Sequence, residues 1–180
     1  MQNNTATIYE KLSTDLKIKN KFATPKITKV VLNIGTGASK INPKFVQVAS
    51  KTLESITGQK PAERMAKKAI AGFKIRAGEK VGLMVTLRGK RMNDFLAKLT
   101  NIVLPRTRDF RGLDIKGFDK QGNYTLAIPE QIVFSEITHE KAELLHGVAI
   151  SIVTTAKDSV QGKYLLMAWC FPFKKGQENG

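Results

Sequence analysis

Hydrophobic and polar residues alternate in three short stretches, which predicts strands over residues 27–34, 83–88 and 148–155. The stretches are rich in β-branched residues, and each has one aliphatic face. The opposite face carries Lys29, Val31 and Asn33 in the first, Met84, Thr86 and Arg88 in the second, and Ala149, Ser151, Val153 and Thr155 in the third. A fourth strand is expected over 123–128, where Pro129 then indicates an edge or a bulge before residues 131–134. We expect the aliphatic faces to form the core and the other faces to stay open.

Apolar residues at spacings of three and four predict helices over residues 5–22, 43–57 and 91–104, and from Asp158 to just before Pro172. Asn42 and Gly58 suit the two ends of the second helix. The third helix has the clearest pattern, and Pro105 is expected to stop it. Its stripe is Met92, Phe95, Leu96, Leu99, Ile102 and Val103. Residues 139–146 form a short helix at best.

The segment between the second helix and the second strand has no clean periodicity. Glycines interrupt residues 65–82, so we expect a long protruding basic loop there. The wider stretch 59–91 has ten Lys and Arg against two Glu, which is +8 of the chain's net +15. Its basic residues are Lys60, Arg64, Lys67, Lys68, Lys74, Arg76, Lys80, Arg88, Lys90 and Arg91. A solvated surface is the ordinary explanation of such charge, but Phe73 and Ile75 alternate with these cations and favour a polyanionic partner.

The 180 residues suit one domain, over 1–180, with a frayed tail at 176–180. A net charge of +15 favours nucleic acid as the partner, with a membrane surface as the competing polyanion. No apolar run is long enough to span a bilayer, and the first ten residues do not resemble a signal peptide. We therefore expect a cytoplasmic protein that does not bind membranes. Its lone Cys170 suits a reducing compartment.

A second basic cluster follows the third helix. Arg106, Arg108 and Arg111 lie in the sequence PRTRDFRG, beside an aromatic residue. Arginine at this density suits contacts with phosphates and bases, which we favour. The same guanidinium groups can instead pair with Asp109 and Asp114.

No catalytic or metal-binding motif is found in the sequence, so we expect neither metal nor cofactor. His139 and His146 lack metal-ligand spacing and are expected to be ordinary surface histidines. An RNA-processing or RNA-modifying enzyme is the alternative, in which Asp109, Asp114 and Asp119 would hold a metal ion. Aspartate is also a favoured turn former, and all three lie in expected loops.

Together these features predict an α+β fold with a mainly antiparallel sheet of four or five strands. Helices pack on one face, and the other face stays open for RNA beside the long basic loop. The open face carries Asn33, Thr86, Arg88 and Ser151 but no paired aromatic residues. This composition favours the shallow minor groove of duplex RNA over stacking on single strands.

Eight motifs resemble the bacterial large-subunit ribosomal protein five family almost from end to end. They are LNIG at 32–35, ITGQKP at 56–61, AGFKIR at 71–76, VTLRGKRM at 85–92, PRTRDFRGL at 105–113, GNYTLAIPEQIVF at 122–134, TTAK at 154–157 and FPFK at 171–174. The resemblance implies binding to 5S rRNA in the central protuberance, through Asn33, Gln59, Thr86 and Arg88. Alternation had already placed three of these on the open face. Lys60, Lys90 and Arg91 are added as basic neighbours.

The resemblance also implies partners beyond 5S rRNA. These are 23S rRNA, other proteins of the central protuberance, a small-subunit head protein across an intersubunit bridge, and P-site tRNA. The tRNA-proximal residues would be Lys67, Lys68, Phe73, Lys74, Ile75 and Arg76. One departure is Arg64, where relatives usually carry a hydroxyl residue. Arg64 can either add an RNA contact or pair with Glu63.

Overall fold

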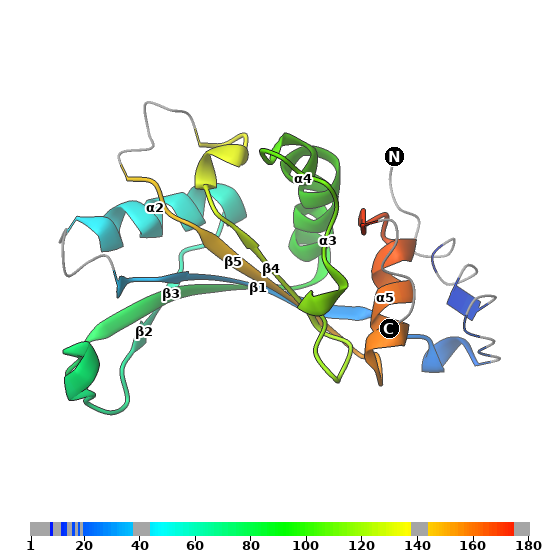
Figure 1. Ribbon diagram of the computed structural model, residues 1–180, viewed down its shortest axis with the longest axis horizontal. Coiled ribbons are helices and arrows are strands. Elements are labelled where there is room, and N and C mark those ends of the chain that lie inside the picture. Colours follow the sequence, from blue (N-terminus) through cyan, green and yellow to red (C-terminus); the bar gives the residue numbers. More distant parts are fainter. Residues whose placement is uncertain are drawn as a thin grey trace. The chain divides into compact units, whose positions relative to one another are not determined.

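A computed structural model of the chain describes residues 8, 12, 13, 16, 18, 20–37, 44–137 and 144–174 (Figure 1). Most of the helix expected over 5–22 lies outside these residues, as do the tail at 176–180 and most of the helix expected over 139–146. Ile8 and Leu12, from the apolar stripe of the first expected helix, are buried.

The sheet has five strands in the order β2-β3-β1-β5-β4. Their bounds are β1 Ile27–Gly35, β2 Ala62–Met65, β3 Lys80–Leu87, β4 Tyr124–Ile128 and β5 Val148–Thr154. β2 and β3 pair antiparallel. The predicted α+β class and the antiparallel sheet are therefore confirmed.

Alternation assigned the two faces of the central strands correctly. Val30, Leu32 and Ile34 of β1 are buried, and so are Leu83, Val85 and Leu87 of β3 and Val148, Ile150 and Ile152 of β5. The residues between them are half-buried or exposed. Successive side chains of a strand point to opposite faces, so one side of each strand is left outside the core.

The helices and helical turns differ more from the prediction. They are α2 Phe45–Thr57, α3 Gly89–Lys98, a π-helix Leu99–Val103, α4 Leu104–Arg106, α5 Ser159–Ala168, and 3₁₀ turns at Lys21–Ala23, Ala71–Phe73, Ile115–Gly117 and Gln131–Val133. Gly58 ends α2 with φ 64°, and the Asp158 side chain caps α5 by accepting a hydrogen bond from the Gln161 N–H at 2.8 Å. After Pro129, the residues Gln131–Val133 form a 3₁₀ turn and do not continue the strand.

Pro105 does not stop the helix that was expected to end at residue 104. The helical path continues to Arg106, with Pro105 inside α4. A π turn precedes the proline, and within it the Leu104 N–H donates to the Leu99 carbonyl. A proline normally breaks a helix because it lacks an N–H and crowds the carbonyl four residues back. The wider π turn shifts that hydrogen-bond register, which allows the proline to remain in the helix.

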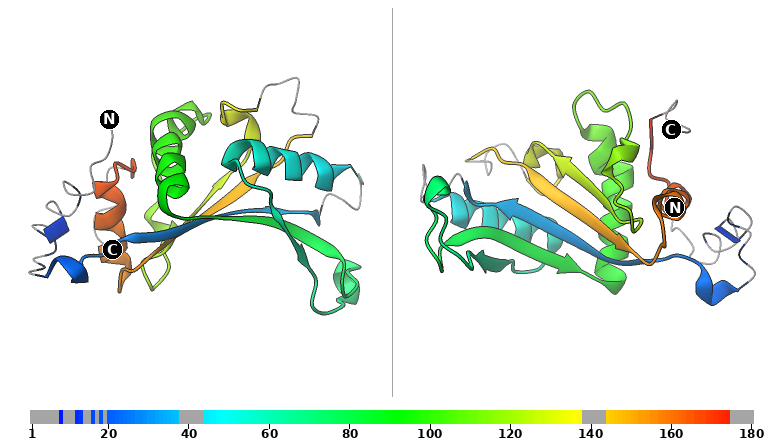
Figure 2. Two further views of the ribbon diagram at one scale, coloured as in Figure 1. Left: turned by 180° about the vertical axis from the view of Figure 1, so that it is seen from behind. Right: turned by 60° about the horizontal axis from the view of Figure 1, so that its bottom comes forward.

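Residues 65–82 are not the structureless loop that we expected. They form the end of a hairpin in which β2 pairs with β3 (Figures 1 and 2). Beyond β2, the Ala66 N–H donates to the Glu79 carbonyl at 2.8 Å, and Ile70 and Ile75 exchange two backbone hydrogen bonds. We call residues 66–79 the hairpin tip. The glycines and the irregular spacing of apolar residues gave no sign of this pairing in the sequence. The hairpin tip is held together by backbone hydrogen bonds and not by an apolar face.

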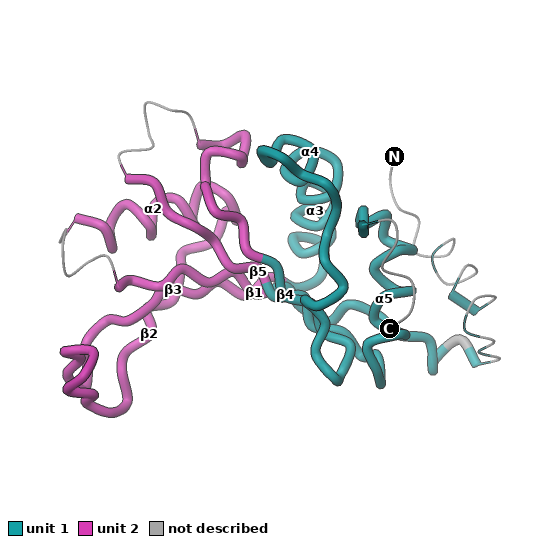
Figure 3. Tube along the Cα trace, viewed as in Figure 1, with its two compact units in different colours: residues 1–30, 88–126, 151–180 teal, residues 31–87, 127–150 magenta. Residues whose placement is uncertain are grey.

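The chain divides into two compact units, shown in teal and magenta in Figure 3. Unit 1 contains residues 1–30, 88–126 and 151–180, and unit 2 contains residues 31–87 and 127–150. Both contribute residues to the five strands. The expected single domain over 1–180 stays a prediction.

Candidate nucleic-acid interface

Three residues of unit 2 form a row across neighbouring strands on the face away from the core. Arg64 of β2 is the register partner of Gly82 of β3. A Cβ atom built on Gly82 would lie 3.6 Å from the Asn33 Oδ1 atom of β1 and 4.0 Å from the Arg64 Cβ atom. Asn33 and Arg64 are exposed on either side of the glycine. The row is therefore a flat strip with an amide at one end and a guanidinium at the other.

The Arg64 guanidinium group is placed by contacts within the same face. Its NH2 group lies 3.7 Å from the Met84 Sδ atom of β3. Glu63, the alternative partner of Arg64, is in an ion pair with Lys80 at 2.8 Å. Adjacent residues of a strand point to opposite faces, so Arg64 and Glu63 diverge. The structure therefore shows no pairing of Arg64 with Glu63, and the RNA contact of Arg64 stays a prediction.

Thr86, Gln59 and Lys60 are the other predicted 5S-binding residues of unit 2. Thr86 is half-buried two residues beyond Met84 on the same face of β3. Gln59 follows the end of α2, where its N–H donates to the Thr57 hydroxyl at 3.3 Å and its carbonyl accepts from that hydroxyl at 3.1 Å. These bonds fix the backbone of Gln59, and the next residue, Lys60, is exposed.

Unit 1 contributes a separate cationic site at the start of α3. Arg88 is the N-cap residue, with an extended backbone, and Lys90 and Arg91 are exposed in the first turn. The N-terminus of a helix carries a partial positive charge, which disfavours cations and favours anions. Three cations there are electrostatically unfavourable in the free protein, and a phosphate group would relieve the repulsion.

The arginines at and after the end of α4 are also open to solvent. Arg106, Arg108 and Arg111 are all exposed. The Arg108 Nε atom lies 3.9 Å from the Asp109 Oδ2 atom, and both side chains are at least 90% exposed. Such an exposed pair contributes little to stability and can exchange for a phosphate. Asp114 instead accepts a hydrogen bond from the Lys116 N–H at 3.0 Å.

The hairpin tip presents the remaining predicted site residues. Lys67, Lys68, Lys74 and Arg76 are exposed, Phe73 is 70% exposed, and Ile75 is half-buried. An aromatic ring this exposed among cations suits stacking on a base.

The carboxylates of the enzyme alternative act as turn formers. The Asp119 carboxylate accepts hydrogen bonds from the Asn123 side chain at 2.7 Å and from the N–H groups of Asn123 and Gln121. These bonds, with that of the Asn123 side chain the largest effect, lower the pKa of Asp119 below its usual value. Among the described residues, no three His, Cys, Asp or Glu side chains are grouped so that they could hold a metal ion.

His146 is not the surface residue that we expected. Its side chain is 8% exposed and meets the edge of Phe45 at 5.5 Å between ring centroids. Burial lowers the pKa of His146, so the neutral form is favoured. The Gln131 side chain holds this segment, accepting from the His146 N–H at 2.7 Å. His139 lies outside the described residues.

Arg64 and Gly82 were not among the predicted binding residues. All four residues of β2 are exposed, so its short sequence AERM shows no apolar alternation from which to assign a face. The face of Arg64 became visible only through the pairing with β3.

In the part of the chain that the structure describes, no helix is long and apolar enough to cross a membrane.

Two family models match most of the chain. The model described as "Ribosomal protein L5" matches residues 20–76, and the model of the C-terminus of the same ribosomal family matches residues 80–173. Among curated proteins, the chain is 49% identical to large ribosomal subunit protein uL5 of Dechloromonas aromatica (strain RCB), over 93% of this chain and 94% of that protein. It is 48% identical to uL5c of Paulinella chromatophora and 45% identical to uL5 of Marinomonas sp. (strain MWYL1), with the same coverage. The chain therefore belongs to the ribosomal protein L5 family, also called uL5.

Proposed function

We propose that this protein, a structural constituent of the large ribosomal subunit, binds 5S rRNA and helps attach it in the central protuberance. Membership of a ribosomal protein family supports the structural role and leaves the enzyme alternative without support. The observation that carries the RNA contact is the row of Asn33, Gly82 and Arg64 across three strands.

The chemistry of this row suits duplex RNA. The minor groove of an RNA duplex is wide and shallow and presents 2′-hydroxyl groups, which both donate and accept hydrogen bonds. The Asn33 amide can do the same, whereas Arg64 only donates. Gly82 between them is buried and adds no side chain, so Asn33 and Arg64 are the exposed groups of the row.

Cations of each unit are proposed to supply phosphate contacts. In unit 2 these are Lys60 and Arg64, and in unit 1 they are Arg88, Lys90 and Arg91 at the start of α3. Phosphate contacts fix orientation on the RNA, while Asn33, Gln59 and Thr86 offer hydrogen bonds of defined geometry. Arg106, Arg108 and Arg111 are further phosphate-binding candidates.

The hairpin tip is proposed to contact P-site tRNA. Its support is the exposure of Lys67, Lys68, Lys74 and Arg76 on a hairpin that extends beyond the apolar core of unit 2. Contacts with 23S rRNA, with other central-protuberance proteins and with a small-subunit head protein across an intersubunit bridge belong to the same proposal.

Replacing one amide tests the 5S contact. We expect Asn33→Ala to weaken 5S rRNA binding about 5- to 100-fold, because a hydrogen-bonding group at the RNA is worth about 1–3 kcal/mol. The fold should survive, since Asn33 is exposed. Filter binding measures the affinity, and a thermal melt measures stability.

Asn101→Ala is the matched control, because Asn101 is an exposed asparagine on the π-helix Leu99–Val103. It should bind 5S rRNA as the wild type does. Equal affinity of the Asn33 variant and the wild type would remove the row from the RNA contact. An equal loss in both variants would show that the effect is not specific to this face.

A further inference from the structure

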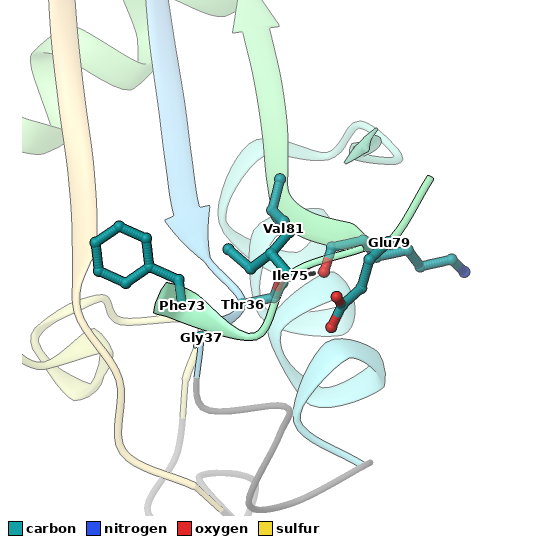
Figure 4. A pocket seen from close by; sticks show the side chains of 7 residues that line it. Thr36, Gly37, Phe73, Ile75, Glu79 and Val81 are labelled. Carbon is teal, nitrogen blue, oxygen red and sulfur yellow. Dashed lines mark hydrogen bonds between the residues drawn. The ribbon is translucent and has the colours of Figure 1, made fainter. Parts of the chain in front are cut away.

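A small cavity lies between the hairpin tip and the end of β1, entirely within unit 2 (Figure 4). Its volume is about 250 Å³. It is lined by Thr36, Gly37, Phe73, Ile75, Glu79, Lys80 and Val81. Sites for drug-sized ligands start at about 300 Å³, so this cavity has room for one planar ring system and little more.

The side of the cavity formed by the tip is held by backbone hydrogen bonds. Ile70 and Ile75 exchange bonds of 2.9 and 3.1 Å across a tight turn, and the Lys74 N–H donates to the Ala71 carbonyl at 2.9 Å. Lys74 adopts a left-handed conformation, with φ 53°. This turn fixes the backbone on both sides of Phe73, whose ring is 70% exposed.

The opposite side is fixed to the same hairpin by Thr36. Its N–H donates to the Val81 carbonyl at 3.1 Å, and its hydroxyl donates to the Lys80 carbonyl at 2.9 Å. The dashed line in Figure 4 marks this second bond. Val81 and Ile75 add apolar side chains to the lining of the cavity. The cavity therefore combines an exposed aromatic ring with apolar lining residues.

The charged residues near the cavity indicate which kind of apolar group it can bind. The tip and its flanks carry six basic residues against Glu63 and Glu79, namely Arg64, Lys67, Lys68, Lys74, Arg76 and Lys80. Lys80 is paired with Glu63, and Glu79 accepts from the Arg76 N–H at 3.0 Å. Four further cations of the hairpin tip, Lys67, Lys68, Lys74 and Arg76, are exposed. The apolar lining suits a flat ring, and the exposed cations of the tip suit a negatively charged chain. A nucleobase combines the two, because it is a ring attached to a polyanionic backbone.

We propose that the cavity receives one unstacked nucleobase of the RNA contacted by the hairpin tip. The base stacks on Phe73, and the flanking phosphates lie against Lys67, Lys68, Lys74 and Arg76. Stacking on an aromatic side chain tolerates any base, because every base has a π face. The proposal rests on the proposed tRNA contact and adds that the tip binds a base as well as the backbone.

Reconstituted ribosomes carrying Phe73→Ala test this proposal. P-site tRNA is probed with base-specific reagents and, separately, with hydroxyl radicals that report on the backbone. We expect at least a fivefold increase in the modification of one base with Phe73→Ala, since stacking on an aromatic ring is worth about that factor or more. Backbone protection should persist, because the four cations remain.

Two control variants test whether the protection of the base depends on an aromatic ring at position 73. Phe73→Tyr keeps an aromatic ring and should protect the base as the wild type does. Phe22→Ala removes a phenylalanine that is 96% exposed in unit 1 and should change nothing. A loss of protection with Phe73→Tyr, or with Phe22→Ala, would contradict a stacking role for this cavity.

The remaining outcomes distinguish this proposal from the proposed tRNA contact. If wild-type ribosomes show backbone protection that depends on the tip but no base protected by Phe73, the base site is refuted and the tRNA contact stands. If removing the tip changes neither protection, the tRNA contact itself fails. A photo-crosslinking amino acid in place of Phe73 that reacts with a protein instead of RNA would also overturn the base site.

Discussion

Individual residues of the open face differ in how far the sequence could place them. Asn33 lies in a strand with strong alternation, so burial of Leu32 and Ile34 determines where its amide points. Arg64 lies in a four-residue strand that buries nothing, and its position depends on the register with β3. A register irregularity between Arg64 and Met65 makes that pairing harder still to infer.

Tyr124 should make the stability of unit 1 fall at alkaline pH. Its hydroxyl donates to the Asp114 carbonyl at 2.8 Å, and its ring is buried between Phe118 and Phe173. Burial, followed by the nearby Asp114 charge, raises the pKa of Tyr124 to about 12. The unfolded chain releases this proton near pH 10. Stability from the neutral phenol is therefore complete below pH 10 and is lost as the pH rises from about 10 to 12.

We expect this loss to reach about 2 kcal/mol at pH 12, and urea unfolding between pH 8 and 12 measures it. Tyr124→Phe is the control, because it cannot titrate. It should be less stable at pH 8 by about 1 kcal/mol, for the lost hydrogen bond, and should decline less steeply above pH 10. Parallel decline of both proteins would show that other groups cause the alkaline loss.

Secondary-structure elements with one continuous apolar face were predicted well. β1, β3, β5 and α2 all fall within a few residues of their expected bounds. Hydrophobic spacing says less about α5, where Val160 and Tyr164 are exposed while Leu165 and Trp169 are buried. Gly162 packs there against the Gly122 backbone, where a Cβ atom would lie 2.5 Å from the Gly122 carbonyl oxygen. The spacing of hydrophobic residues in the sequence cannot predict such a close backbone contact.

The hairpin tip should be separable from the rest of unit 2. Replacing residues 69–77 by a short Gly-Ser linker keeps the Ala66–Glu79 hydrogen bond and removes no buried side chain. We expect the free energy of unfolding to change by no more than about 0.5 kcal/mol, as for most surface changes. Affinity for 5S rRNA should also be unchanged, because the row of Asn33, Gly82 and Arg64 remains.

The same replacement should remove protection of P-site tRNA in assembled ribosomes. Urea unfolding, filter binding and chemical probing measure the three effects independently. A large loss of 5S affinity would show that the tip belongs to the 5S contact. A large loss of stability would show that the tip is part of the structural core of unit 2.

For the whole molecule, composition predicted the class of partner and could not locate the contact. A net charge of +15 favours a polyanion, but charge acts over the entire surface and is compatible with many binding faces. Strand alternation located Asn33 and Thr86 on the open side, and strand pairing added Arg64 and Gly82. Arg88 was expected there too, but it follows the end of β3 as the N-cap residue of α3. The residues at the start of α3 belong to unit 1, whereas the row belongs to unit 2.

The most direct test of the account is the binding of the full chain to 5S rRNA as a function of salt concentration. If the exposed Lys and Arg side chains neutralise about 5 phosphates, the logarithm of the association constant should fall with that of salt with a slope of about −4 to −5. An unrelated RNA of equal length controls for nonspecific attraction. It should bind far more weakly than 5S rRNA at every salt concentration. A slope near zero, or equal affinity for both RNAs, would contradict a specific and electrostatically driven 5S contact.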